Sequence, residues 1–408
     1  MTVVRRAAAA ALLALAVTAS ASAGAHLVPR PTYTGGDGPE RLVASPFVVV
    51  HYTRTGPDHP RFMRDDDHDG VPNYVEKLAA AANKAWLWYA HNGFHAPLPD
   101  TGGPDSRVDI YVKALPPGVY GETFPTARAQ GRAFMVVDNQ LDMAHVATHG
   151  SLQQTVAHEL FHLFQNAYVP SGRIPAWAAE GSALAMQTYV YPQIVDRATF
   201  QYLDAWLSQP WRSVFDQGRG CIHCYGGALF WRFLFGLGGN VVSQYFGRLY
   251  GYTKVHRAIG LGLQPLDEVL HRYAHGSLYD AYTRFSYDIY RAGYEPAPLY
   301  SIAATPTPVR TRPCVVRGLS THYIPIRVPE TAEGIGVGVA AVAGPNPAAT
   351  LVVGGPKGRR VARVMRDRGH VQLFVTSFRN ARERTHVMLI VTSGRAVGTA
   401  YQVATQSL

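Results

Sequence analysis

The sequence has 408 residues, of which 47% are hydrophobic and 16% are charged, and its formal net charge is +10. This hydrophobic content is ordinary for a globular protein and the length exceeds what one core usually serves, so we expect two domains. Basic residues are scattered, with short clusters such as 357–360. This scatter makes nucleic-acid binding a weak hypothesis. An anionic cell-envelope polymer is an equally good explanation for a basic surface.

The first residues resemble an export signal. Arg5 and Arg6 precede a short apolar run at 7–18, and small residues follow at 21–23. The apolar run is shorter than the roughly 20 residues that span a bilayer, which argues against the alternative of a membrane anchor. We therefore predict a signal peptide at 1–23, a secreted, extracellular protein and no transmembrane segment. A Gly-, Pro- and Thr-rich lead-in at 24–44 is expected to be loosely ordered.

The region 45–295 mixes strand and helix patterns, which predicts an α+β fold with a small mixed sheet and a mostly helical remainder. Strands are expected at 47–52, 107–112 and 133–137, and helices at 73–92, from 151, at 175–191, 197–207, 224–237, 240–250, 265–274 and 278–292. The strand at 133–137 is a candidate edge on which an extended peptide binds, with a plain internal strand as the alternative.

An acidic loop precedes the first predicted helix. Residues 65–76 match the pattern D-x-D-x-D-G-x5-E at every fixed position, and Gly70 permits the sharp turn that this pattern needs. The expected calcium ligands are Asp65, Asp67, Asp69, Val71 through its carbonyl, and Glu76. Pro72 is unusual for a helix-loop-helix hand, so we expect an isolated Ca²⁺ loop that braces one helix. The alternative is a solvated acidic turn.

The helix that starts near 151 carries a metal-binding pattern. Ser151 and Gln154 form a capping box that predicts the helix start, and His158-Glu159-Leu160-Phe161-His162 follows. Histidines four residues apart lie on one helix face and can share a zinc ion, and Glu159 is placed to accept a proton from water. The alternative is a core helix whose histidines are satisfied by hydrogen bonds.

The next helix offers a third ligand. Zinc in catalytic sites takes three protein ligands and keeps one open position. Glu180, within Trp177-Ala178-Ala179-Glu180-Gly181-Ser182-Ala183, can complete a His2Glu set with His158 and His162. The metzincin pattern would require glycine and histidine where Gln165 and Tyr168 stand, so that branch is excluded.

A segment with two cysteines offers further candidates. Tyr225 and His223 are alternative donors to the oxyanion that forms when water attacks a carbonyl. Cys221 and Cys224 are expected to form a local disulfide, which would leave Cys314 as a free thiol or as a partner for another chain. Beyond a Pro- and Thr-rich linker at 296–313, alternating patterns predict a β-sandwich domain at 314–408.

The order H-E-L-F-H, then W-A-A-E-G-S-A with 17 residues between His162 and Glu180, resembles the gluzincin zinc metallopeptidases. Together with D-D-D-H-D-G-V-P-N-Y-V-E and Y-G-G-A-L-F-W-R-F-L, it resembles a bacterial group of secreted metalloproteases with an N-terminal D-x-D-x-D-G loop. The resemblance covers roughly residues 45–250 and implies that the region 45–295 is a zincin-like catalytic domain, with zinc on His158, His162 and Glu180 and Glu159 as general base. Tyr225 resembles a helix-opening tyrosine of gluzincin aminopeptidases. Leu184 stands where thermolysin-like members place an acidic residue behind a ligand histidine.

The sequence thus predicts a secreted zinc metallopeptidase with Zn²⁺ and Ca²⁺ as cofactors and a protein or peptide as substrate. The aminopeptidase element G-x-M-E-N is absent from the sequence, which favours an endopeptidase. The alternative is a catalytically inactive, calcium-stabilised envelope or adhesion protein whose C-terminal domain binds a surface polymer.

Overall fold

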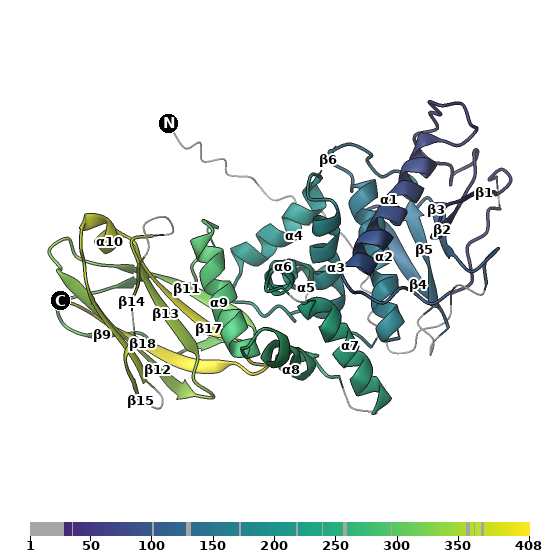
Figure 1. The fold of residues 1–408 in the computed structure, drawn as a ribbon. Helices are drawn as coiled ribbons and strands as arrows, with labels where there is room; N and C mark the ends of the chain where they lie inside the picture. Colours follow the sequence, from purple (N-terminus) through teal and green to yellow (C-terminus); the bar gives the residue numbers. More distant parts are fainter. Residues whose placement is uncertain are drawn as a thin grey trace, which may run out of the picture.

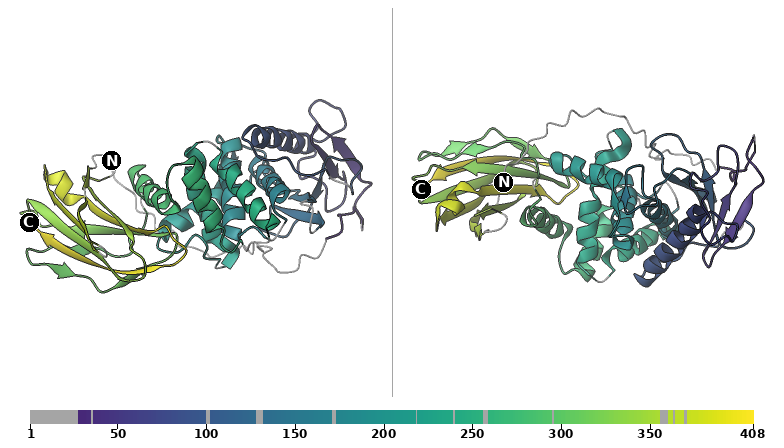
Figure 2. Two further views of the ribbon diagram at one scale, coloured as in Figure 1. Left: turned by 60° about the horizontal axis from the view of Figure 1, so that its bottom comes forward. Right: turned by 90° about the horizontal axis from the view of Figure 1, so that it is seen from above.

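The computed structural model describes residues 28–34, 36–99, 102–127, 132–170, 173–217, 219–238, 240–255, 259–294, 296–355, 360–362, 364–368 and 371–408. The predicted signal peptide at 1–23 lies outside these residues. The fold is α+β, as predicted: a sheet at one end, helices in the middle and a β-rich region at the other end (Figure 1). Two further views show the same order along the long axis (Figure 2). Within the described residues, no helix is both long and apolar enough to cross a membrane.

The N-terminal sheet has the strand order β1-β2-β3-β5-β4. Its strands are β1 (Arg41–Ala44), β2 (Val48–Tyr52), β3 (Val108–Lys113), β4 (Gly121–Ala127) and β5 (Arg132–Asp138). The three central strands run parallel, whereas β1 and β4 are antiparallel edges. Helices α1 (Asn73–His91) and α2 (Leu152–Tyr168) pack on one face through a shared apolar core (Figure 1).

The position of β4 corrects one prediction. The strand predicted at 133–137 is β5, and it lies inside the sheet between β3 and β4, so it offers no free edge. The edge is β4, whose sequence G-E-T-F-P-T-A lacks a β-branched run and contains Pro125. Proline is tolerated in a sheet mainly on edge strands, because it cannot donate a ladder hydrogen bond.

The lead-in is held on the other face of the sheet, so the expectation of loose order is wrong for 28–34. Arg30 forms an ion pair with the buried Asp109, and the Tyr33 hydroxyl lies 2.6 Å from the carbonyl oxygen of His51. The Tyr33 ring also packs against a small apolar cluster that contains Phe134. This segment therefore covers the sheet opposite α1 and α2.

The central region is helical, as predicted. Its helices are α3 (Ala176–Val190), α4 (Arg197–Ser208), α5 (Ile222–Gly226), α6 (Ala228–Gly236), α7 (Val241–Lys254), α8 (Leu263–Tyr273) and α9 (Leu278–Arg291), with a 3-10 turn at Arg219–Cys221. The short strands β6 (Val146–Ala147) and β7 (Val195–Asp196) pair in parallel beside α2 and α4. Ser151 caps α2 by accepting a hydrogen bond from the Gln154 backbone N–H, so the helix starts where predicted. The reciprocal half of the predicted capping box is absent from the described residues, because the Ser151 backbone N–H donates to Asp196 at 3.1 Å.

The C-terminal region forms two sheets around one apolar core. The first contains β9 (Val309–Arg310), β10 (Cys314–Val316), β12 (Gly334–Ala343), β15 (Val364–Arg368), β16 (Val371–Ser377) and β18 (Thr399–Ser407). The second contains β8 (Ile302–Ala303), β11 (Ser320–Arg327), β13 (Ala348–Val353), β14 (Arg360–Ala362) and β17 (Val387–Ser393), and a short helix α10 (Ala381–Thr385) precedes β17. Two of these strands, β8 and β9, lie inside the predicted linker 296–313 and pair with β11 and β18.

The β-rich region is packed against the helical region. The buried Tyr323 on β11 donates a hydrogen bond of 2.8 Å to the carbonyl of Ser286 on α9. The neighbouring Thr321 N–H donates to the carbonyl of Pro210 at 2.8 Å. The second of these contacts fixes the loop that leads to the cysteine pair and Tyr225.

Candidate metal centre

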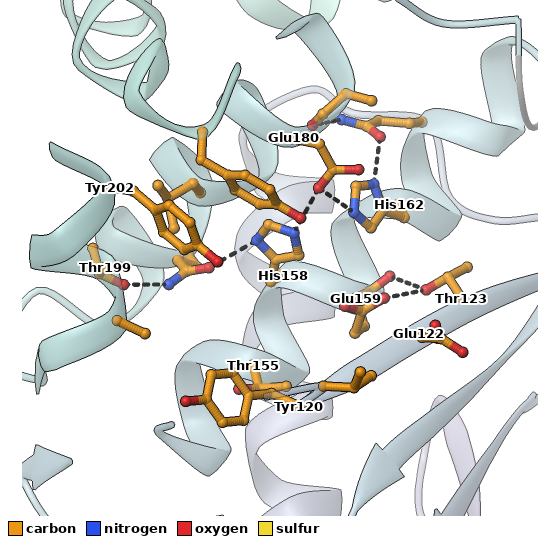
Figure 3. Close-up of a pocket in the computed structure, with 18 of the residues that line it drawn as sticks. Tyr120, Glu122, Thr123, Thr155, His158, Glu159, His162, Glu180, Thr199 and Tyr202 are labelled. Atoms are coloured by element: carbon orange, nitrogen blue, oxygen red, sulfur yellow. Dashed lines mark hydrogen bonds and ion pairs between the residues drawn. The ribbon is translucent and has the colours of Figure 1, made fainter. Parts of the chain in front are cut away.

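Two helices bring the three predicted zinc ligands together. His158 and His162 lie one turn apart on α2, and Glu180 lies on the facing side of α3 (Figure 3). The Nε2 atoms of the two histidines are 3.3 Å and 3.5 Å from the same Glu180 oxygen, Oε2. These side chains are largely buried, with exposed fractions of 11%, 16% and 18%. The predicted ligand set therefore converges on one point.

A glutamine fixes the ring of His162. The Gln165 Nε2 group donates to the Ala179 carbonyl and to the Ser182 hydroxyl, both at 2.9 Å. Because a carbonyl only accepts hydrogen bonds, the amide must present its Oε1 to His162 Nδ1, which lies 2.8 Å away. The Nδ1 atom therefore carries a proton, and Nε2 is the ring nitrogen that faces Glu180, at 3.5 Å from Oε2.

A chain of two glutamines fixes His158 in the same way. Gln154 donates from Nε2 to the carbonyls of Tyr191 and Ile194, at 3.2 Å and 3.3 Å, so its Oε1 is left to accept from Gln187 Nε2 at 3.4 Å. Gln187 must then turn its own Oε1 toward His158 Nδ1, at 2.9 Å. This ring also turns its Nε2 atom toward Glu180, at 3.3 Å from Oε2.

This arrangement fits a divalent cation. Two imidazole nitrogens and a carboxylate oxygen converge on one point, and such a cluster is stable only with a proton or a cation between its members. Burial alone would lower the pKa of His162, but the Glu180 carboxylate outweighs burial and raises that pKa to about 9. Burial would raise the pKa of Glu180, but the two imidazoles hold it well below its usual range. The donor set of two nitrogens and one oxygen is one that zinc accepts.

Glu159 is held beside the centre by β4. The Thr123 hydroxyl lies 2.8 Å from Glu159 Oε2, so it can orient the carboxylate (Figure 3). Gly121 allows the strand to approach this closely, because a Cβ atom there would lie 2.8 Å from Glu159 Cγ. The geometry therefore places an oriented carboxylate next to the three ligand atoms.

Tyr225 lies at the centre, whereas His223 does not. The Tyr225 hydroxyl bonds to the Glu180 carboxylate, and its ring stacks on Tyr202 with centroids 4.4 Å apart. The predicted disulfide between Cys221 and Cys224 is present and immediately precedes Tyr225. Burial raises the pKa of Tyr225 well above its usual value, so the phenol keeps its proton.

His223 is buried away from the cavity. Its ring does not line the cavity around the centre, and burial, together with the nearby Arg212, lowers its pKa to about 4. Of the two oxyanion donors that the sequence left open, the geometry brings Tyr225 to the centre.

A cavity of about 250 Å³ surrounds these groups. The polypeptide between Gly118 and Phe124, which includes the first part of β4, forms one wall, and residues of α2, α3 and α4 form the others. The carboxylates of Glu122, Glu159, Glu180 and Asp196 line it, and the described lining contains no lysine or arginine. Burial and the neighbouring Glu159 raise the pKa of Glu122.

Gln187 takes the place of an acidic residue behind His158. Leu184, where thermolysin-like enzymes carry an acid, lines the cavity and offers no side-chain hydrogen bond. The partner of His158 stands two helical turns after Glu180 instead of one, on the same face of α3. The sequence analysis did not identify three glutamines as supports of the centre: Gln154, Gln165 and Gln187. Their spacing from the proposed ligands places each of them near the same helix face, which could have indicated this role.

The acidic loop gathers the predicted carboxylates away from this cavity. Ligand oxygens of Asp65, Asp67 and Asp69 lie within 4.8 Å of one another. Asp65 Oδ1 is buried without a hydrogen-bond partner among the described residues. Burial, followed by the charges of these aspartates, raises the pKa of Glu76, which places its carboxylate within their field. The orphaned oxygen and the clustered charges fit a hard cation such as Ca²⁺. The Val71 backbone N–H donates to Asp69 at 2.7 Å, which shapes the turn.

Comparisons with known proteins assign no family. No protein-family model and no curated protein matches the chain. Among solved structures, the chain is similar to the pre-peptidase C-terminal domain of a collagenase from Bacillus anthracis, with 12% identity and a TM-score of 0.20. That match covers 27% of this chain and 98% of the collagenase domain.

Proposed function

We propose that this protein is a secreted zinc-dependent peptidase that hydrolyses internal peptide bonds. One observation carries the proposal: the Nε2 atoms of His158 and His162 converge on a single oxygen of Glu180, at 3.3 Å and 3.5 Å, and backbone-anchored glutamines fix both rings. This is the donor set of a catalytic zinc site with an open coordination position. A neighbouring carboxylate and a neighbouring phenol supply the remaining groups that peptide hydrolysis requires.

Each group has a distinct task. Zinc bound to His158, His162 and Glu180 would supply Lewis acidity that activates water at neutral pH. Glu159 accepts the proton of the attacking water and passes it to the leaving amine, while Thr123 holds the carboxylate in place. The Tyr225 hydroxyl donates a hydrogen bond to the developing oxyanion and stays protonated, because burial raises its pKa.

The wall formed by β4 supports an extended peptide as the substrate. The strand is an edge of the sheet, and an edge can take up another strand through main-chain hydrogen bonds. The described cavity lining offers no lysine or arginine to pair with a free terminal carboxylate. This supports cleavage within a chain over cleavage at its carboxyl end.

We also propose Ca²⁺ in the acidic loop and an anionic envelope polymer as the partner of the C-terminal region. Asp65, Asp67 and Asp69 would hold the calcium ion, with Glu76 and the Val71 carbonyl as further ligands. In the sequence of 314–408, 12 lysines and arginines stand against four aspartates and glutamates. A polymer with phosphate or carboxylate groups suits such a charge.

Digestion of a peptide library tests the proposal. We expect the zinc-loaded protein to cleave internal bonds, a chelator to abolish cleavage and added zinc to restore it. Glu159→Gln should lose cleavage and keep its zinc, whereas Glu268→Gln, a control on α8, should retain both. A protein that binds zinc but cleaves no peptide in the library would instead support the inactive envelope protein.

A further inference from the structure

Asn166 is a buried amide in the wall of the cavity. It lies on α2, four residues after His162, and only 7% of its surface is exposed. Its side chain lines the cavity. This side chain makes no hydrogen bond with any part of the chain that the structure describes.

The neighbouring amides behave differently. Gln154, Gln165 and Gln187 have both ends of their amides in hydrogen bonds that orient the ligand histidines. Buried amides are normally paired in this way, because an amide removed from bulk water needs partners. The Asn166 amide is instead left open toward the space in which a substrate would lie.

Asn166 is aligned with the reacting groups. Thr155, Glu159, His162 and Asn166 follow one another at intervals of three or four residues, so they form one stripe along α2, and all four line the cavity. Four residues of helix rise about 6 Å. An extended peptide advances about 3.3 Å per residue. A peptide that runs along this stripe therefore presents to Asn166 a peptide unit about two residues from the bond at the metal centre.

We infer that Asn166 is a substrate-binding residue that pairs with a main-chain amide of the peptide, about two residues from the cleaved bond. The side-chain amide has both a donor and an acceptor, which matches the N–H and C=O of a peptide unit and makes the contact independent of substrate sequence. Ile174 and Ala176 also line the cavity, which gives a substrate side chain apolar surface to contact. This inference rests on the proposed peptidase function.

Substrates with single ester bonds test the inference. In a peptide that the protein cleaves, each amide other than the cleaved one is replaced in turn by an ester, which removes one N–H donor. For the wild-type protein we expect one replacement, about two residues from the cleaved bond, to lower kcat/KM by about 3- to 10-fold. Asn166→Ala should lower kcat/KM for the all-amide peptide by a similar factor, mainly by raising KM, and should show no further loss with that ester.

Control measurements separate this contact from a structural role and from the proposed function. Asn166→Ala should keep the zinc content and the unfolding temperature of the wild type, and Asn92→Ala, at the end of α1, should leave the ester profile unchanged. An ester profile that is the same in Asn166→Ala and wild type overturns the inference while leaving the peptidase intact. A wild-type protein that cleaves no peptide overturns the proposed function itself.

Discussion

The side-chain carbonyl of Gln187 accepts a hydrogen bond from Nδ1 of His158 at 2.9 Å. Its orientation is set through Gln154 by the carbonyls of Tyr191 and Ile194 on the segment that follows α3. A neutral amide at this position fixes the ring without adding charge to the centre. A carboxylate would fix the ring and also add a negative charge. The proposed metal centre is therefore supported by a series of hydrogen bonds that ends on backbone carbonyls.

Removal of this support should weaken zinc binding. Gln187→Leu leaves His158 Nδ1 without its acceptor and frees the ring to rotate or to change tautomer. We expect a loss of zinc affinity of about 10- to 100-fold. Competition with a chromogenic chelator measures this affinity. Gln153→Leu should bind zinc like the wild type, because Gln153 is a buried glutamine of α2 that takes no part in the hydrogen bonds between Gln154, Gln187 and His158. Equal affinity in both variants would contradict the role of Gln187.

The oxyanion donor can be distinguished kinetically. Tyr225→Phe removes one hydroxyl next to Glu180 and should lower kcat by about 100- to 1,000-fold with little change in KM. His223→Gln should leave kcat within a few-fold of wild type, because His223 does not line the cavity. Steady-state kinetics of the two variants on one peptide gives the answer. A large loss in His223→Gln alone would reverse the assignment.

Calcium should stabilise the fold through the loop at 65–76. At a concentration 100-fold above its Kd, a ligand that binds only the folded state adds about 2.7 kcal/mol to the free energy of unfolding. We expect the unfolding temperature to rise with Ca²⁺ in the wild type and not in Asp67→Asn. Asp66→Asn is the matched control, because Asp66 bonds Asn73 and Arg64 and lies outside the cluster. No response of the wild type to Ca²⁺ would refute the site.

The network under the lead-in predicts a pH dependence of stability. Burial lowers the pKa of His51, but hydrogen bonds to Asp109 and Glu40 outweigh burial and raise the pKa above the ordinary value of 6.5. A raised pKa in the folded state stabilises the fold fully below pH 6.5, and this contribution is lost as the pH rises through the raised value. The protein is therefore expected to lose stability as the pH rises above 6.5.

Denaturant unfolding at a series of pH values checks this prediction. The difference in unfolding free energy between the wild type and His51→Gln should be largest at and below pH 6.5 and should shrink at higher pH. A difference that grows with pH would contradict a raised pKa of His51. The metal centre is unchanged in this variant, so zinc content serves as the control.

The convergence of the three proposed zinc ligands was predictable from sequence because it depends on local geometry. The spacing of His158 and His162 places both rings on one helix face, and the order of the chain brings Glu180 onto the next helix. Strand β4 was not predicted, because its residues have weak strand preference and its conformation depends on pairing with β5. The glutamine chain was missed for a similar reason, since Gln154 finds its partners on a segment about 40 residues away.

A zinc-edge anomalous difference map of crystals of the purified protein shows whether zinc binds between the two histidines and Glu180. We predict one strong peak at about 2.0–2.2 Å from His158 Nε2, His162 Nε2 and a Glu180 carboxylate oxygen. Crystals of Glu180→Ala should lose the peak or show it at much lower occupancy. Crystals of the wild-type protein grown with zinc that show no peak between these residues would contradict the account.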